Sequence, residues 1–193
     1  MKRKAINILG YIFLTLGVLS IGVYVWTRSL KPTYEGTLTL EGVSAPVSVY
    51  FDKYGVPHIE AENELDAAVA LGYVHAQDRL WQMELLRRIG RGELSALFGE
   101  RAIATDQLFL TLGIQENSQK QVDQLKSTDP EFQLINAYLS GINQFQENGP
   151  TPIEFYLTGV NKRPFTILDL YNSLGYMAFS FAIGQRTDPL ITH

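Results

Sequence analysis

The longest uncharged stretch of the sequence lies at its N-terminus and divides the chain into two unequal parts. No charged residue occurs between Ala5 and Trp26, and the stretch is flanked by basic residues, which are Lys2, Arg3, Lys4, Arg28 and Lys31. A helix over residues 5–26 would span about 33 Å, enough to cross a bilayer. We therefore predict that residues 1–31 form a membrane anchor or signal segment and that residues 5–26 contact the membrane.

The flanks of this segment favour an uncleaved anchor over a cleaved signal peptide. Tyr24 and Trp26 lie where an interfacial aromatic belt is expected, and the segment lacks a convincing Ala-x-Ala cleavage site. A buried core helix is disfavoured, because both ends are charged. With either an anchor or a cleaved signal, the rest of the chain is exported if the positive N-terminus stays inside. We expect an exported protein, either membrane-anchored or periplasmic (extracytoplasmic).

Composition limits the function classes that remain. Hydrophobic residues make up 46% and charged residues 19% of the 193 residues, which is typical of a globular domain. The formal charge of −4 gives no basic footprint for nucleic acid, so we expect no nucleic-acid partner. The absence of cysteine excludes disulfides, thiolate chemistry and cysteine-based zinc sites.

Residues 32–193 have the pattern of one α+β domain that begins with strands. Around Leu38 and Leu40, and again over residues 47–51, apolar and polar side chains alternate with the period of a strand. A turn around Gly55 leads to a third short strand over residues 56–61. We predict a short N-terminal β-meander.

The remainder of the domain is predicted to be mainly helical. Asn63 can cap a long helix that ends at Gly90 or Gly92, because glycine favours helix C-caps. A short helix in "ELSALFG" should end at Gly99. Further helices are expected over residues 106–113, 129–145 and 167–183, and a loop-rich connection over 147–165.

The long helix contains the stretch "GYVHAQDRLWQMELLRR", which places polar groups beside large apolar ones. Apolar residues recur at spacings of three and four along one face, and Val74, Trp81 and Leu85 extend this apolar surface. Asp78 and Gln82 lie one turn apart and must find partners or lie in a cleft, since an unpaired buried polar group costs about 1–3 kcal/mol.

The sequence contains none of the common motifs of a self-contained catalytic site. The sequence lacks a Gly-x-Ser-x-Gly elbow, a His-Glu-x-x-His pair, a phosphate loop and an EF-hand loop. His58, His75 and His193 are the only imidazole bases. For His58 and His75 a structural role is favoured over a catalytic one.

Three motifs nevertheless resemble the N-terminal portion of the penicillin acylase (penicillin amidase) family of N-terminal-nucleophile hydrolases. They are D-x-x-G-x-P-H-I at residues 52–59, G-Y-x-x-A-Q-D-R-L-x-Q-M-E at 72–84 and R-R-x-x-x-G-x-L at 87–94. "PIEFYLTG" and "KRPFTILD" are similar to the family's later loop and helix entry. The resemblance covers about residues 47–181.

The resemblance implies a precursor that cleaves itself into an α chain and a larger β chain and adopts an αββα fold. The first residue of the β chain, usually serine, is both nucleophile and base, because a free α-amino group with a pKa near 7.7–8.0 can accept the hydroxyl proton. The sequence ends at "TDPLITH" without a Gly-Ser or Ser-Asn junction. We therefore expect these residues to be an α-chain portion that is inactive alone, with no catalytic residue and no cofactor for the chemistry.

The resemblance also suggests substrate-binding, structural and metal residues. Met177 and Phe181 match a Met and a Phe of the acyl pocket, although packing in the core is an equal alternative, and Ser180 replaces an Arg common in the family. Asp188 is the nearest carboxylate to the position that supplies a structural calcium ligand. Four polar residues are expected to have structural or processing roles: Gln77, Asp78, Arg79 and Gln82. Their partners would come from the β chain or from a local buried network.

Together these observations predict the α-chain portion of an exported amidohydrolase that cleaves the linear amide of an N-acyl compound. Penicillin-like β-lactams, acyl-homoserine lactones and other acylated amines are the expected substrates, and the β chain of the same precursor is the expected partner. The alternative is a truncated, non-catalytic, membrane-anchored domain that binds a partner or a small apolar ligand.

Overall fold

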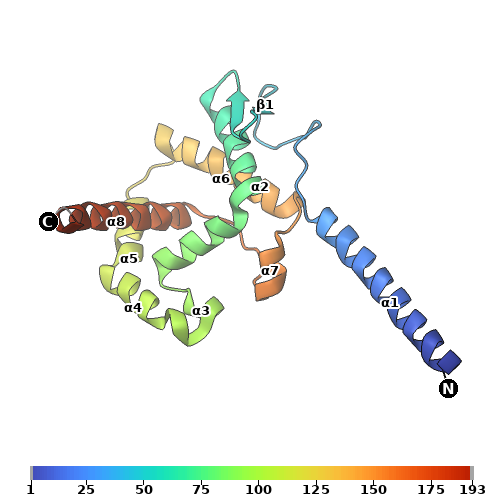
Figure 1. Ribbon diagram of the computed structural model, residues 1–193. Helices are drawn as coiled ribbons and strands as arrows, with labels where there is room; N and C mark the ends of the chain where they lie inside the picture. Colours follow the sequence, from blue (N-terminus) through green and yellow to red (C-terminus); the bar gives the residue numbers. More distant parts are fainter. Residues whose placement is uncertain (1, 192–193) are drawn as a thin grey trace.

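The computed structural model describes residues 2–191 of the chain, with side chains for residue 7 and residues 10–184 (Figure 1). It is mainly helical and has one small sheet, as the α+β prediction requires. In chain order the elements are α1 (Lys2–Ser29), β1 (Ser48–Phe51), β2 (Pro57–Glu60), α2 (Glu64–Arg91), α3 (Ser95–Phe98), a 3-10 turn (Gly99–Ala102), α4 (Ile103–Leu112), α5 (Ile114–Val122), α6 (Pro130–Asn148), α7 (Ile153–Thr158) and α8 (Ile167–Ile191).

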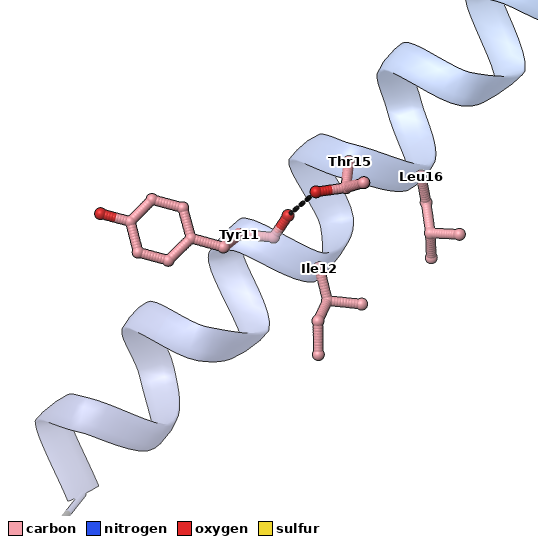
Figure 2. A pocket seen from close by; sticks show the side chains of 4 residues that line it. All are labelled: Tyr11, Ile12, Thr15 and Leu16. Carbon is pink, nitrogen blue, oxygen red and sulfur yellow. Dashed lines mark hydrogen bonds between the residues drawn. The ribbon is translucent and has the colours of Figure 1, made fainter.

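The N-terminal apolar segment is a single helix, α1, which leaves the rest of the chain and points away from it (Figure 1). Its stretch Gly10–Ser29 is long and apolar enough to cross a membrane, and none of it is buried against the domain. Figure 2 shows Tyr11, Ile12 and Leu16 on its open surface beside Thr15, whose hydroxyl donates to the Tyr11 carbonyl at 2.8 Å. The Thr15 hydroxyl is thus satisfied within the helix.

The sheet has two strands, so the prediction of a three-stranded meander is wrong in its first strand. β1 and β2 pair antiparallel with Val49 opposite Ile59, and the turn between them is closed by the Asp52 carboxylate, which accepts from two backbone N–H groups. The segment around Leu38 is irregular, and at its end Glu41 bonds to a side chain of α6. The side-chain amide of Gln144 on α6 accepts from the Glu41 N–H at 2.7 Å and donates to the Glu41 carbonyl at 3.0 Å, where a strand neighbour would otherwise pair.

Helix α2 begins and ends where the sequence predicts. The Asn63 side chain caps its start by accepting from the Asp66 N–H at 2.9 Å, and Gly92 ends it in the left-handed conformation at φ 66°. The buried Asp66 carboxylate does not complete a capping box. It instead accepts the backbone N–H groups of Ser44 and Ala45, and the bond from the Ser44 N–H is the main reason why the pKa of Asp66 is lowered. α2 is thereby tied to the segment that precedes β1.

The core forms where α2 crosses α6, which is the most extensive helix contact of the chain. The two backbones approach closely because glycine lies on both helices. A Cβ atom at Gly72 would lie 1.9 Å from the Tyr138 carbonyl oxygen, and one at Gly141 would lie 1.9 Å from the Val69 carbonyl oxygen. The side chains around this crossing form the main hydrophobic cluster, which comprises Ala76, Leu80, Met83, Leu139, Ile142, Phe145, Phe155 and Phe165.

Helices α5 and α7 were not predicted, for two different physical reasons. α5 is polar along most of its length and packs on α8 through Ile114, whose Cγ2 atom would lie 2.7 Å from a Cβ atom at Gly175. α7 lies inside the segment that was predicted to be a loop-rich connection. It follows Pro152, which occupies the N-cap of this short helix. α8 begins at Ile167 as predicted and continues beyond residue 183.

Substituting Gly141 by alanine should destabilise the fold, because the added methyl group meets backbone atoms that cannot rotate away. Overpacking of this kind costs about 1–3 kcal/mol, which for a chain of this size lowers the unfolding temperature by about 2–10 °C. Thermal unfolding followed by circular dichroism measures the shift. Gln133→Ala, at an exposed position of α6, is the matched control and should leave the unfolding temperature unchanged. Equal unfolding temperatures for Gly141→Ala and this control would contradict the close crossing.

Candidate functional site

Helix α2 changes direction inside the stretch that resembles the family motif. Arg79 has a non-helical backbone, with φ −135° and ψ 16°, between two regular helical segments. Sharp kinks in helices most often occur at proline or glycine, and neither is present at this position. Backbone departures of this kind concentrate at functional sites. The kink therefore marks the surface around Arg79 as a candidate site.

The four polar residues of this stretch are mostly exposed. Asp78, Arg79 and Gln82 face solvent and Gln77 is half-buried. Asp78 accepts a hydrogen bond from the Tyr34 hydroxyl at 2.8 Å, and burial of the phenol together with the Asp78 carboxylate raises the pKa of Tyr34. The side chains of Arg79 and Gln82 have no hydrogen-bond or ion-pair partner among the residues that the structure describes. Among the described residues these four side chains do not form a fully buried network, and partnership with a β chain stays a prediction.

The two residues predicted to bind an acyl group lie on one exposed face of α8. Met177 is 43% exposed and Phe181 is 69% exposed, and Leu174 continues the same apolar surface. The opposite side of α8 packs inward, where Tyr176 and Phe179 both make edge contacts with the Phe109 ring at centroid distances of 5.5 and 5.7 Å. Neither Met177 nor Phe181 belongs to the hydrophobic core of the described residues. Their role in binding an acyl group stays a prediction.

The predicted calcium ligand lies outside the described side chains. Asp188 is in the last part of α8, where the structure describes the helix but not its side chains. Among the described residues, no group of three or more His, Asp or Glu side chains could hold a metal ion.

A buried ionic cluster joins α2 to the start of α8, and sequence reasoning assigned it no role. Glu84 and Arg87 are both fully buried and form an ion pair, and Arg88 donates to the other Glu84 oxygen at 2.6 Å. Asp169, also buried, lies 3.8 Å from the Arg87 guanidinium and 3.6 Å from that of Arg91. The spacing of Glu84, Arg87 and Arg88, three and four residues apart on one face of the helix, is the signal that could have revealed this cluster.

Arg87 also fixes the backbone that leads into α8. Its guanidinium donates to the carbonyl groups of Arg163 and Pro164 at 3.1 and 3.3 Å, and it lies over the Phe165 ring, 4.2 Å from the centroid. Burial lowers the pKa of Arg87, while Glu84 and Asp169 favour its charged form. The side chain therefore contacts several consecutive residues directly before the helix.

The first turn of α8 is closed by a reciprocal cap in which the same carboxylate takes part. The Asp169 carboxylate accepts from the Thr166 N–H at 3.0 Å, and the Thr166 hydroxyl accepts from the Asp169 N–H at 3.3 Å. This is a capping box, a motif of the form Thr-x-x-Asp that the sequence contains in "TILD". Because Asp169 also faces Arg87, the position of α8 is linked to that of α2.

A shallow apolar groove is lined by residues of β2, α2, α6 and α8. Its volume is about 630 Å³, and its lining residues are Ile59, Glu64, Ala67, Ala68, Leu71, Leu134, Ile135, Tyr138 and Leu170. At its edge, the Tyr138 hydroxyl lies 2.6 Å from the His75 ring nitrogen. Burial, with the nearby positive charge of Arg79, lowers the pKa of His75, and burial raises that of Tyr138. The lining supplies a mainly apolar surface, and the His75–Tyr138 contact lies at its edge.

Comparison with known proteins assigns the chain to a family. Residues 46–193, most of the chain, match the model of the penicillin amidase family. The chain belongs to this family. It is 41% identical over 139 residues to penicillin acylase 2 proenzyme of Pseudomonas sp. (strain SE83), covering 72% of this chain and 18% of that protein. It is 34% identical over 121 residues to the acyl-homoserine lactone acylase QuiP of Pseudomonas aeruginosa, covering 62% and 14%.

A solved structure of the family has a similar fold. A thermostable penicillin G acylase from Alcaligenes faecalis matches with a TM-score of 0.61 and 28% sequence identity, covering 71% of this chain and 74% of the matched chain. This agrees with the mainly helical architecture, while the αββα arrangement stays an expectation. The chain spans only about 18% of the length of the Pseudomonas proenzyme. It represents a small part of that protein's sequence.

Replacing Arg87 by methionine should destabilise the chain strongly, because Glu84 and Asp169 would lose a buried cation. Breaking a buried ion pair from one side costs about 3–5 kcal/mol. Arg163→Gln is the control: it removes the Arg163 guanidinium from its half-exposed pair with Glu93, at 3.0 Å, and should cost about 1 kcal/mol or less. Urea unfolding of both variants measures the difference. Similar losses in the two variants would contradict a special role for the buried cluster.

Proposed function

We propose that this chain is the α-chain portion of a self-processing amidohydrolase that hydrolyses the linear amide bond of an N-acyl compound. One observation carries this proposal: Leu174, Met177 and Phe181 form an exposed apolar face on a helix whose start is fixed by buried ion pairs. An apolar surface on a rigid element suits the binding of an acyl group. The matches to penicillin acylases and acyl-homoserine lactone acylases support the same reaction class.

In the proposed reaction the nucleophile comes from a β chain outside these residues. Its N-terminal hydroxyl attacks the amide carbonyl, and its own α-amino group takes the hydroxyl proton and passes it to the leaving amine. The C–N bond breaks and an acyl-enzyme ester forms. Water then adds to the ester, releasing the carboxylic acid and regenerating the hydroxyl. This route assigns no general base to His58 or His75, which agrees with their structural contacts to Asp52 and Tyr138.

The contribution of this chain is to bind and orient the acyl group. Met177 and Phe181 lie one turn apart, so they can clamp one apolar group between them. Arg87 and Asp169 hold the start of α8 against α2 and thereby set the direction in which this face points. Burying an apolar acyl chain here would be favourable by about 25 cal/mol per Å² of apolar surface removed from water.

The remaining predicted roles extend the same proposal. The exposed polar residues at the α2 kink would pair with the β chain, which would supply the partners that Arg79 and Gln82 need. Asp188 would contribute one ligand to a structural calcium site completed by other parts of the protein, since one carboxylate cannot hold the ion alone. No cofactor is required for the amide chemistry.

We also propose that α1 anchors an exported protein in the membrane. The helix contains an apolar stretch of 20 residues with no burial against the domain, and basic residues precede it at the N-terminus. Basic residues favour the cytoplasmic side, which would place the domain outside. A cleaved signal sequence is the alternative for the same segment.

A second candidate function is non-catalytic binding by an anchored domain. The groove of about 630 Å³ beside Tyr138 favours it, because this groove is apolar, lies on the described chain alone and is large enough for a small ligand. In that case a ligand would bind there without any need for α8 or a β chain.

The substrate proposal is tested with Phe181→Ala in the natural gene product, assayed on N-acyl amines that share one chromogenic leaving group. For an aromatic acyl group, kcat/KM should fall by about 10–200-fold, the range for loss of contacts in an apolar pocket. For the acetyl analogue it should change little, because the small group does not reach the ring.

Phe98→Ala removes an exposed aromatic side chain on α3 and is the control for general effects. It should leave both rates unchanged. Hydrolysis of both substrates with no difference between Phe181→Ala and Phe98→Ala would exclude the acyl-pocket role. Absence of hydrolysis for every substrate in the unsubstituted protein would instead favour the binding domain.

A further inference from the structure

The short helix α7 is fixed to the core on one side and exposes two apolar side chains on the other. Phe155 is buried, and its ring makes an edge contact with Trp81 at a centroid distance of 5.1 Å. The next two residues turn outward: Tyr156 is 55% exposed and Leu157 is 76% exposed. Successive helical residues point about 100° apart, so one short helix can do both. Because Phe155 fixes α7 to the core, a contact made by Tyr156 or Leu157 would hold the domain rigidly against the surface that they touch.

This exposed side of α7 lies against the end of the proposed membrane helix. The rings of Trp26 and Tyr156 make an edge contact at a centroid distance of 5.7 Å. Figure 1 shows α7 near the point where α1 leaves the domain, while β1 lies on the other side of the domain in this view. The contact therefore connects a side chain of α1 with one of the domain.

The length of α1 places this contact at a defined depth. The apolar stretch ends at Ser29, and Trp26 lies three residues earlier, about 4.5 Å along the axis. The polar interfacial layer on each side of a bilayer is about 5–8 Å thick. If α1 crosses the membrane, Trp26 lies at the boundary of this layer, where Trp and Tyr side chains accumulate. Tyr156, in contact with it, must lie at or close to the same layer.

We infer that α7 is a second membrane contact, in which Tyr156 and Leu157 lie in the interfacial layer of the bilayer beside the outer end of α1. This inference rests on the proposed anchor. Tyrosine suits that position because it has an apolar ring and a hydrogen-bonding hydroxyl, and leucine gains from removal of its side chain from water. The bilayer is the favoured occupant of this face because the face continues directly from the surface of α1.

The inference has a structural consequence for the domain. A single helix followed by the irregular segment over residues 32–47 would let the domain rotate about the anchor. A second contact through α7 limits this rotation, because Phe155 fixes α7 to the core cluster around Phe145 and Leu80. The domain would then keep one orientation relative to the bilayer.

The experiment uses the absence of cysteine from these residues to attach one probe at a time. Leu157→Cys is prepared in the natural gene product, with any cysteine outside residues 1–193 replaced by serine, and labelled with the fluorophore NBD. The protein is placed in lipid nanodiscs with or without a nitroxide quencher at the headgroup level. Val25→Cys on α1 is the positive control, and Tyr54→Cys, in the exposed turn between β1 and β2, is the negative control.

The inference predicts that the quencher reduces NBD fluorescence at position 157 to a similar extent as at position 25, by at least twofold, and leaves position 54 unchanged. Quenching at 25 without quenching at 157 would overturn the inference and leave the anchor in place, as would occur if another part of the protein covers α7. Absence of quenching at both 25 and 157 would overturn the anchor and the inference with it. Leu157 is an exposed position, so its substitution should not prevent folding.

Discussion

The buried ion pairs of Arg87 are the interaction on which the arrangement of this chain depends. One guanidinium joins Glu84 on α2, Asp169 on α8 and the backbone at residues 163–164 that leads into α8. Charges removed from water must remain paired, since an unpaired buried charge costs several kcal/mol. The relative positions of α2 and α8 are therefore strongly coupled. This cluster therefore sets the orientation of every surface on α8 relative to α2.

Several polar side chains of the domain bond to backbone groups, whereas several apolar surfaces stay exposed. Asp66, Asp169 and Asn143 each bond to backbone groups of distant or preceding segments and close the fold locally. The apolar face of α8, the groove beside Tyr138 and the exposed side of α7 are left open. Large exposed apolar patches mark surfaces that contact a partner, a ligand or lipid. The proposals assign the apolar face of α8 to an acyl substrate and the exposed side of α7 to a membrane, and in the alternative function the groove binds a small ligand.

Local sequence signals predicted most helices, and longer-range contacts decided what they missed. Asn63 and Gly92 mark the ends of α2 correctly, because capping depends on neighbouring residues. The strand predicted around Leu38 does not form, and the backbone of Glu41 at the end of that segment bonds to Gln144, which is far away in sequence. The spacing of Glu84 and Arg87 on α2 could have suggested their ion pair, whereas the contact of Arg87 with Asp169 joins two helices and has no local signal. Met177 and Phe181 came from family resemblance, and spacing alone would have placed them in a core.

The central claim is that this chain belongs to a precursor that cleaves itself to release a nucleophilic N-terminus. Mass spectrometry and N-terminal sequencing of the natural gene product, expressed with any downstream sequence, test it most directly. The account predicts two chains, one containing α2 and α8 and a second that begins with serine, threonine or cysteine. A single uncleaved product, with no such second chain, would contradict it.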